Sequence, residues 1–392
     1  MKNFTYYAPT RIFFGKGEYK RVGEIVRSYG FRKVLLHYGG GSIKRSGLFD
    51  EVTGSLRDAG IAYVDFGGAQ PNPTLEHATE GMKICVKENV DLVLAVGGGS
   101  AIDSAKHIAV GAKNDCDTWR FAMKEDTPKG ALPVATILTI AASGSEMSAS
   151  AVISNEKLGL KRGYNSDYHR ALFSILSPEL TFTLPPYQTA CGVTDIMMHT
   201  LERYLTRPGE AAVTDRVAEG LLRTVIEAGR AALKDPCDYE ARANLMWAGS
   251  LSHNDLTGLG RDFFMISHQF EHEISGMFPE VAHGAGLAVV FPAWAKHVYK
   301  RHAARFARLA EVLWDIREGS DEEKALAGIR AFEAYFREIG MPTRMRELGI
   351  GEEAFRPMAE KCTANGTKIL SAIEDYDTDK IVEVFRLADA AD

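Results

Sequence analysis

The stretch Leu92-Val93-Leu94-Ala95-Val96-Gly97-Gly98-Gly99-Ser100 joins an apolar run to a glycine turn, and a helical pattern follows from Ala101 to Ala109. The apolar run is short and contains no polar residue, which is typical of a strand that is buried on both faces of a sheet. Glycine allows a tight turn and a close approach of the backbone to a ligand. The stretch therefore predicts a buried strand, a tight turn and a helix in that order.

The same order of elements occurs earlier in the chain. Lys33–Tyr38 is predicted to be a buried strand, and it ends in Gly39-Gly40-Gly41-Ser42 before a helical pattern. A further strand is expected at 61–66 and a helix at 74–88. This alternation predicts a parallel sheet covered by helices. The remaining strand-like segments, of which the last two would extend the sheet, are 11–14, 133–139, 151–154 and 171–176.

The character of the sequence changes near Pro185-Pro186. From Tyr187 onward the hydrophobic periodicity is helical. Helices are expected at 189–206, 211–233, 239–252, 266–276, 286–300, 301–317 and 321–338. We therefore predict two domains, an α/β domain over residues 1–186 and an all-helical domain over residues 187–392.

Composition and charge exclude several classes of protein. The 392 residues are 45% hydrophobic and 25% charged, and the net charge of −6 gives no electrostatic footprint for nucleic acid or an anionic membrane. No apolar run approaches the ~18–20 residues of a membrane span, and the N-terminus lacks the apolar core of a signal peptide. The scattered cysteines form no Cys-x-x-Cys pair, so free thiols in a reducing cytoplasm are expected. These cysteines are at positions 85, 116, 191, 237 and 362.

Both Gly-Gly-Gly-Ser turns are candidates for phosphate binding. Backbone N–H groups at a helix start attract phosphate, and ligands collect at the carboxyl ends of parallel strands. Neither turn is Gly-x-Gly-x-x-Gly, so the usual dinucleotide fingerprint is absent and a plain tight turn is the alternative. Beside the first turn, Ser42, Lys44 and Arg45 offer a hydroxyl and two bases, and the loop contains no acid that would repel a 2′-phosphate. This favours NADP(H) over NAD(H), unless the bases only form a solvated helix start.

Two histidine-bearing stretches are candidates for a single metal site. Asp195 and His199 are four residues apart and therefore share one face of a helix. His268 and His272 repeat that spacing, and His283 precedes two glycines that suggest a break in the helix. One carboxylate and several imidazoles are an ordinary ligand set for a divalent transition metal.

These residues also have other interpretations. An Asp195/His199 pair can be a surface ion pair, although the apolar neighbours indicate a buried helix in which an aspartate needs a partner. The segment from His268 to His272 matches His-x-x-Glu-His, the inverted zincin signature, in which both histidines bind zinc and the glutamate activates water. A metallohydrolase would not need paired glycine turns, which counts against this alternative.

Taken together, the motifs resemble the iron-dependent (group III) alcohol dehydrogenase family over nearly the whole chain. Within that family, Tyr38–Ser42 with Lys44 is similar to the branch of NADPH-dependent butanol dehydrogenases and broad-range aldehyde reductases. The resemblance implies an N-terminal Rossmann-like dinucleotide-binding domain, a C-terminal helical domain, a site in the cleft between them, and a homodimer. The motifs that carry it are Pro9–Gly15, Gly97–Lys106, Gly144–Glu146, Asp195 with His199, His268 with His272, and His283-Gly284.

The resemblance also implies a role for each matching residue. His272 matches a histidine beside the nicotinamide and the substrate that does not bind metal, and it could pass the alcohol proton towards solvent or only shape the pocket. The implied ligands of the metal, with Fe²⁺ or Zn²⁺ as the ion, are Asp195, His199, His268 and His283. The implied cofactor contacts are Gly39, Gly40, Ser42, Gly97, Gly98, Gly99, Ser100, Asp103, Thr139, Ser143, Ser145 and Lys161.

The sequence departs from the family pattern in two places. Ser143 stands where members commonly have threonine, and the segment Glu273–Ala282 is one residue longer than usual, which bears on the placement of His283. Phe263, Phe264, Met265 and Phe270 could line an apolar substrate pocket, or they could simply belong to the core.

The implied function is an NADP(H)-linked alcohol dehydrogenase or aldehyde reductase. Its substrates would be short-chain primary alcohols and aldehydes such as butanol and butanal, with the metal acting as a Lewis acid during hydride transfer. The alternatives are a polyol, glycerol or lactaldehyde-type dehydrogenase and a non-catalytic nucleotide-binding or metal-binding module.

Overall fold

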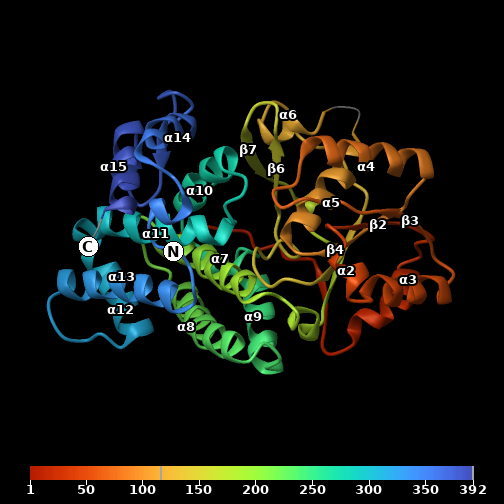
Figure 1. Ribbon diagram of the computed structural model, residues 1–392, viewed down its shortest axis with the longest axis horizontal. Helices are drawn as coiled ribbons and strands as arrows, with labels where there is room; N and C mark the ends of the chain where they lie inside the picture. The colour runs from red at the N-terminus through yellow and green to blue at the C-terminus, as the bar shows by residue number, and fades with distance from the viewer. Residues whose placement is uncertain (115–116, 391–392) are drawn as a thin grey trace. The chain divides into compact units, whose positions relative to one another are not determined.

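The computed structural model describes residues 1–114 and 117–390, which fold into two compact units (Figure 1). One unit is Tyr7–Thr183, and the other runs from Leu184 onward and includes Met1–Tyr6. The first six residues were expected in the α/β domain, but the backbone N–H of Lys2 donates to the carbonyl of Gly260 at 3.0 Å. That hydrogen bond attaches the N-terminal segment to the helical unit. Cys116, one of the cysteines expected to be free, lies outside the described residues, whereas the other four are free thiols.

The α/β unit is built on a six-stranded parallel sheet in the order β1-β8-β5-β4-β2-β3, which confirms the predicted fold class. Helices α4 and α5 lie on one side of the sheet, and α2 and α3 lie on the other (Figure 1). The strands β4 and β5 are buried along their whole length, because both faces are covered. The strands are β1 (Arg11–Phe14), β2 (Lys33–Tyr38), β3 (Ala62–Phe66), β4 (Leu92–Gly97), β5 (Val134–Leu138) and β8 (Phe173–Leu176). The helices are α1 (Val22–Ser28), α2 (Ser42–Arg45), α3 (Leu48–Asp58), α4 (Leu75–Glu88), α5 (Gly99–Gly111) and α6 (Trp119–Ala122).

One predicted extension of this sheet is wrong. Residues 151–154 belong to β6 (Ser150–Asn155), which pairs antiparallel with β7 (Leu160–Asn165) in a separate two-stranded sheet. Buried and less buried residues alternate along β6, whereas all four residues of β8 are buried. An alternating pattern suits a ribbon with one covered face, and a continuous apolar pattern suits the interior of a parallel sheet.

The helical unit is organised around α7 (Pro186–Tyr204), in which Val193 to Tyr204 are all buried. The unit is not all-helical, because the short strands β9 (Leu370–Ser371) and β10 (Asp375–Tyr376) pair antiparallel. No helix in the described ranges is long and apolar enough to cross a membrane. The other helices are α8 (Ala212–Lys234), α9 (Tyr239–Ser252), α10 (Ile266–Met277), α11 (His283–Val298), α12 (Ala303–Trp314), α13 (Asp321–Glu338), α14 (Phe355–Cys362) and α15 (Thr378–Asp389).

Glycines near the start of α11 bring it close to its neighbours instead of breaking it. The expected break at 284 and 286 is wrong, because α11 begins at His283 and includes both glycines. A Cβ atom on Gly284 would lie 2.6 Å from Cα of Cys191 on α7, and one on Gly286 would lie 2.9 Å from Cγ of Glu271 on α10. The absence of side chains at these positions therefore lets three helices pack closely.

Candidate functional site

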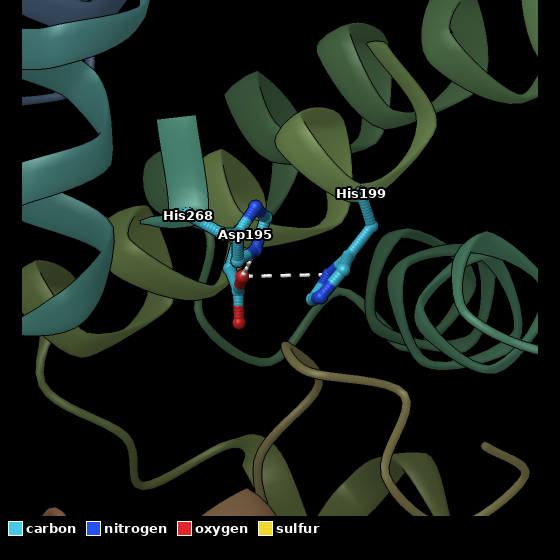
Figure 2. A group of neighbouring side chains, drawn as sticks. All are labelled: Asp195, His199 and His268. Carbon is cyan, nitrogen blue, oxygen red and sulfur yellow. Dashed lines mark ion pairs between the residues drawn. The ribbon is translucent and has the colours of Figure 1, made fainter. Parts of the chain in front are cut away.

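Three side chains of the helical unit converge on one point, as Figure 2 shows. Asp195 and His199 lie one turn apart on α7, and His268 comes from α10. Oδ1 of Asp195 is 3.4 Å from Nδ1 of His199 and 3.4 Å from Nε2 of His268. The ligand atoms of all three residues lie within 4.8 Å of one another, and all three side chains are buried. The helical spacing of the first pair and the contact between α7 and α10 thus assemble a compact group of donors.

This group fits a divalent cation. Oδ1 of Asp195, Nδ1 of His199 and Nε2 of His268 have no hydrogen-bond partner within the described part of the chain. Buried polar atoms without partners are costly and therefore uncommon. One carboxylate oxygen and two imidazole nitrogens are suitable ligands for a transition metal, and an ion between them would satisfy all three atoms at once.

His283, the predicted fourth ligand, lies beside this group. Its Nε2 is 3.7 Å from Oδ1 of Asp195, and its ring centroid is 5.3 Å from that of His268. Its side chain is 29% exposed, whereas those of the other three are buried. The longer segment before it therefore does not remove His283 from the site, and its role as a ligand stays a prediction.

Glu202, which sequence reasoning missed, orients His268. It lies on α7 two turns after Asp195, so both side chains are on the same face of the helix. Nδ1 of His268 donates to its carboxylate, as do the backbone N–H groups of His268 and Ser267. With Nδ1 held by Glu202, Nε2 is the ring nitrogen that faces Asp195 and that an ion would bind. The signal in the sequence was an acid on the ligand face of a predicted buried helix.

Glu271 has the same relation to His283. Nδ1 of His283 donates to one oxygen of Glu271, and the hydroxyl of Ser275 donates to the other. Glu271 is fully buried, and His272 is not a member of the metal-binding group. The inverted zincin alternative is therefore wrong, because its glutamate would have to face a water and His272 would have to share the metal with His268.

His272, the predicted catalytic residue, is half-buried on α10 and its ring centroid is 6.1 Å from that of His283. It thus neighbours His283 and does not belong to the candidate metal group of Asp195, His199 and His268. This position is compatible with a proton-transfer role, which stays a prediction.

Burial and charge shift the pKa values of two buried histidines, His199 and His268, in opposite directions. Burial, followed by the nearby imidazole of His253, holds the pKa of His199 well below its ordinary value, so its ring is neutral. His253, which sequence reasoning did not connect with the site, stacks on His199 with ring centroids 4.0 Å apart. Burial also disfavours the charged form of His268, but the carboxylates of Glu202 and Asp195 outweigh it and raise the pKa to about 9.

The predicted cofactor residues lie in the α/β unit, where β2 and β4 are neighbours with Tyr38 opposite Val96. The turns Gly39–Ser42 and Gly97–Ser100 therefore follow adjacent strands at the same edge of the sheet. No side chain caps α5 at Gly98 in the described structure, so the first N–H groups of this helix are available to an anion such as a phosphate.

Several of the other predicted cofactor residues gather around this second turn. The backbone N–H of Thr139 donates to the carbonyl of Gly97 at 3.0 Å. A Cβ atom on Gly99 would lie 3.0 Å from Cβ of Ser143 and closer still to its hydroxyl, so glycine is needed where the two loops meet. The structure thus brings Thr139 and Ser143 to the turn, and their contact with a cofactor stays a prediction.

Asp103 connects α5 to the second loop and to β6. Its Oδ1 accepts a hydrogen bond from Oγ of Ser145 at 2.5 Å, and its Oδ2 accepts one from the N–H of Val152 at 3.0 Å. Burial raises the pKa of Asp103, and the positive charges of Lys106 and Lys161 partly oppose that shift. Asp103 is thus occupied in holding the loop, and Lys161 is close enough to act on it.

The first turn differs from the sequence expectation in one respect. Nζ of Lys44 lies 3.2 Å from Oδ2 of Asp65 on β3, and the hydroxyl of Tyr38 donates to Oδ1 of the same carboxylate at 2.6 Å. An acid therefore stands beside Lys44, although the loop itself contains none. The prediction that the loop itself lacks an acid holds, but the neighbouring strand β3 supplies one, and the preference for NADP(H) stays a prediction.

The apolar residues considered for a substrate pocket differ in burial. Phe270 is fully buried, and its ring centroid is 5.6 Å from that of Phe385, so it belongs to the core. Phe263 is 37% exposed, and the guanidinium of Arg203 lies 4.8 Å from its ring centroid. Phe270 is therefore excluded as a lining residue.

Comparisons with known proteins identify the family of the chain. Residues 9–178 match the family model "Iron-containing alcohol dehydrogenase", and residues 189–388 match "Fe-containing alcohol dehydrogenase family, C-terminal". The NADH-dependent butanol dehydrogenase A of Clostridium acetobutylicum is 42% identical over 388 residues, which are 98% of this chain and 99% of that protein. The NADPH-dependent aldehyde reductase YqhD of Escherichia coli is 37% identical over 391 residues, which are 99% of this chain and 100% of that protein.

Solved structures give the same result. The crystal structure of the NADH-dependent butanol dehydrogenase A from Thermotoga maritima matches with a TM-score of 0.96 and 38% identity, over 100% of this chain and 99% of that chain. The two family models together span both units, and both curated relatives are similar over nearly their full length. The chain belongs to the iron-containing alcohol dehydrogenase family, in the branch of butanol dehydrogenases and aldehyde reductases.

Proposed function

We propose that this enzyme interconverts short-chain primary alcohols and aldehydes, such as butanol and butanal, with NADP(H) as the hydride carrier. The observation that carries the proposal is the convergence of Asp195, His199 and His268 on one buried point, where three atoms have no hydrogen-bond partner among the described residues. The names of the similar proteins, butanol dehydrogenase and aldehyde reductase, support this substrate class.

The helical unit would hold the metal and move the proton. A bound divalent ion, with Fe²⁺ expected from the family name, supplies a Lewis acid at the substrate oxygen while the nicotinamide carries the hydride. Asp195 would bring one negative charge to the site and His199 a neutral ring, and His268, whose pKa is raised to about 9, would give up its proton on Nε2 when the ion binds. His272 would accept the alcohol proton at a ring nitrogen during oxidation and return it during reduction.

The choice of NADP(H) depends on the first glycine turn. Ser42 and Lys44 offer a hydroxyl and a positive charge for a 2′-phosphate, but Lys44 is already paired with Asp65 at 3.2 Å. A 2′-phosphate would have to compete with this carboxylate for the lysine. The similar proteins include both NADH-dependent and NADPH-dependent enzymes. Because Lys44 is shared with Asp65, we expect the preference for NADP(H) over NAD(H) to be modest.

The experiment that tests the function follows the oxidation of NADPH and of NADH with butanal as substrate. Metal-stripped enzyme is used alone and after separate addition of Fe²⁺ or Zn²⁺, and lactaldehyde is tested in parallel as a carbonyl substrate. Glycerol, which can only be oxidised, is compared with butanol in the reverse direction by following the reduction of NADP⁺ and of NAD⁺. The expected result is metal-dependent oxidation that is faster with NADPH and butanal than with the other pairs. Faster turnover of glycerol or lactaldehyde would favour the polyol-type alternative, and no turnover with any metal would favour a non-catalytic module.

A further inference from the structure

Two buried carboxylates stand behind two of the imidazoles in the helical unit. Glu202 is 1% exposed and Glu271 is fully buried, and each accepts a hydrogen bond from Nδ1 of one histidine. The opposite nitrogens, Nε2 of His268 and Nε2 of His283, lie 3.4 Å and 3.7 Å from Oδ1 of Asp195. Each glutamate therefore fixes both the tautomer and the direction of its ring.

The two glutamates differ in what surrounds their oxygens. Both oxygens of Glu202 face donors, which are two backbone N–H groups and the N–H of His268. An amide at this position would turn its NH₂ group towards a donor and lose at least one of these hydrogen bonds. Position 202 therefore requires a carboxylate.

The second oxygen of Glu271 faces a hydroxyl, that of Ser275. A hydroxyl can donate or accept, so it can rotate to accept from an amide NH₂. A glutamine at position 271 could then keep its carbonyl oxygen on the N–H of His283. The charge would be lost, but the orientation of the ring would survive.

We propose that Glu202 and Glu271 are positioning residues that set the affinity of the site for its metal. Glu202 must be an anion, whereas Glu271 can be replaced by glutamine with a smaller loss. The inference rests on the proposed function only in taking Asp195 and the histidines as the ligands of a divalent ion.

The test measures the affinity of purified, metal-free protein for Zn²⁺ by competition with a chromogenic chelator. Removing such a hydrogen-bond partner of a metal ligand typically weakens binding by about 10–100-fold, so we expect a loss in this range for Glu202→Gln and less than about tenfold for Glu271→Gln. Co²⁺ is a second probe, because its visible spectrum reports ligand geometry and should change more in Glu202→Gln. Circular dichroism confirms that each variant is folded before metal is added.

Glu219 provides a matched control, because it is another buried glutamate of the helical unit. It accepts hydrogen bonds from Arg308 and from the hydroxyl of Tyr204 and contacts none of the predicted ligands in the described structure. Glu219→Gln should lower the melting temperature and leave the Zn²⁺ affinity unchanged. A general loss of stability would lower the Zn²⁺ affinity of the control and test variants alike. Loss of a positioning hydrogen bond would lower it only in the variants at positions 202 and 271.

Wild-type affinity in folded Glu202→Gln would overturn the proposal, and so would a wild-type protein that binds neither Zn²⁺ nor Co²⁺. If Glu271→Gln lost as much Zn²⁺ affinity as Glu202→Gln, the proposed difference between the two glutamates would be overturned. If Glu202→Gln does not fold, Glu202→Asp keeps the charge but withdraws it from His268 and should also bind Zn²⁺ more weakly; unchanged affinity there would overturn the proposal. A protein that binds Zn²⁺ with these differences but reduces no aldehyde would refute the proposed function and leave this inference standing.

Discussion

Replacing Gly284 with alanine tests whether the close packing of α7 and α11 positions the metal ligands. The added methyl group would lie 2.6 Å from Cα and 2.8 Å from the carbonyl carbon of Cys191, which are backbone atoms that cannot rotate away. Since carbon atoms pack at about 3.5–4.0 Å, the two helices would have to separate by about 1 Å. His283 is the residue directly before Gly284, and Asp195 lies one turn after Cys191 on α7. The substitution therefore acts on the site through the backbone on both sides.

The expected effects on stability and on metal binding can be separated. Overpacking of this kind costs typically about 1–3 kcal/mol, and we expect the upper end because both neighbouring atoms are backbone. His283 Nε2 is 3.7 Å from Asp195 Oδ1, and metal–ligand distances tolerate changes of only about 0.2 Å, so a 1 Å separation should remove His283 from the ligand set. We expect the Zn²⁺ affinity to fall about tenfold or more and the melting temperature of the metal-free protein to fall by about 5 °C.

Gly220 is the control for this substitution. It lies inside α8, and a Cβ atom there would have no neighbour within 4 Å. Gly220→Ala should stabilise the helix by up to about 1 kcal/mol and leave Zn²⁺ binding unchanged. Thermal unfolding and chelator competition are measured on both variants without metal. A Gly284→Ala protein with the wild-type melting temperature and Zn²⁺ affinity would refute the reasoning, because the packing would then be able to adjust without cost.

Three further predictions concern other parts of the chain. Burial would raise the pKa of Asp215, but the guanidinium groups of Arg305 and Arg261 outweigh burial and hold this pKa below its ordinary value. The ionised Asp215 therefore stabilises the fold fully at pH values above the ordinary pKa, and this stabilisation is lost as the pH falls through the lowered pKa. The melting temperature of Asp215→Asn should therefore be well below that of the wild type at neutral pH and should approach it in acid; a constant difference would contradict this. His272→Ala should lower turnover with butanal by about 10²-fold and change the pH–rate profile while the Zn²⁺ affinity stays the same, and unchanged kinetics would remove His272 from the mechanism. Asp65→Asn should increase the ratio of NADPH to NADH activity, and a ratio that does not rise would show that this carboxylate does not limit the preference.

The parts of the fold that the sequence predicted well depend on local patterns. The apolar run at 92–97 with its glycine turn, and the helical spacing of Asp195 and His199, are set by residues that are close in the chain. The parallel direction of the strands then follows from the alternation of strands and helices, whereas their order in the sheet does not. The strand β7 was missed because Leu160–Asn165 is rich in polar residues and gains its structure from pairing with β6.

The parts of the site that the sequence did not predict depend on contacts between distant segments. Glu202 approaches His268 only when α7 packs against α10, and Asp65 approaches Lys44 only when β3 pairs with β2. These contacts join residues that are far apart in the chain, so no pattern within one helix or loop could predict them. The glycines after His283 suggested a break for the same reason, because their small size serves the neighbouring helices rather than the local backbone.

The origin of the candidate ligands in three helices has a consequence for stability. Asp195 and His199 come from α7, His268 from α10 and His283 from α11, so an ion held by all four would bind the folded arrangement and not the unfolded chain. Binding of this kind raises the free energy of unfolding by about 4 kcal/mol when the free metal concentration is 1,000 times the dissociation constant. The metal supply would then govern how long the helical unit survives heat or proteolysis as well as how fast the enzyme turns over. An enzyme that loses its ion would become easier to degrade at the same moment that it becomes inactive.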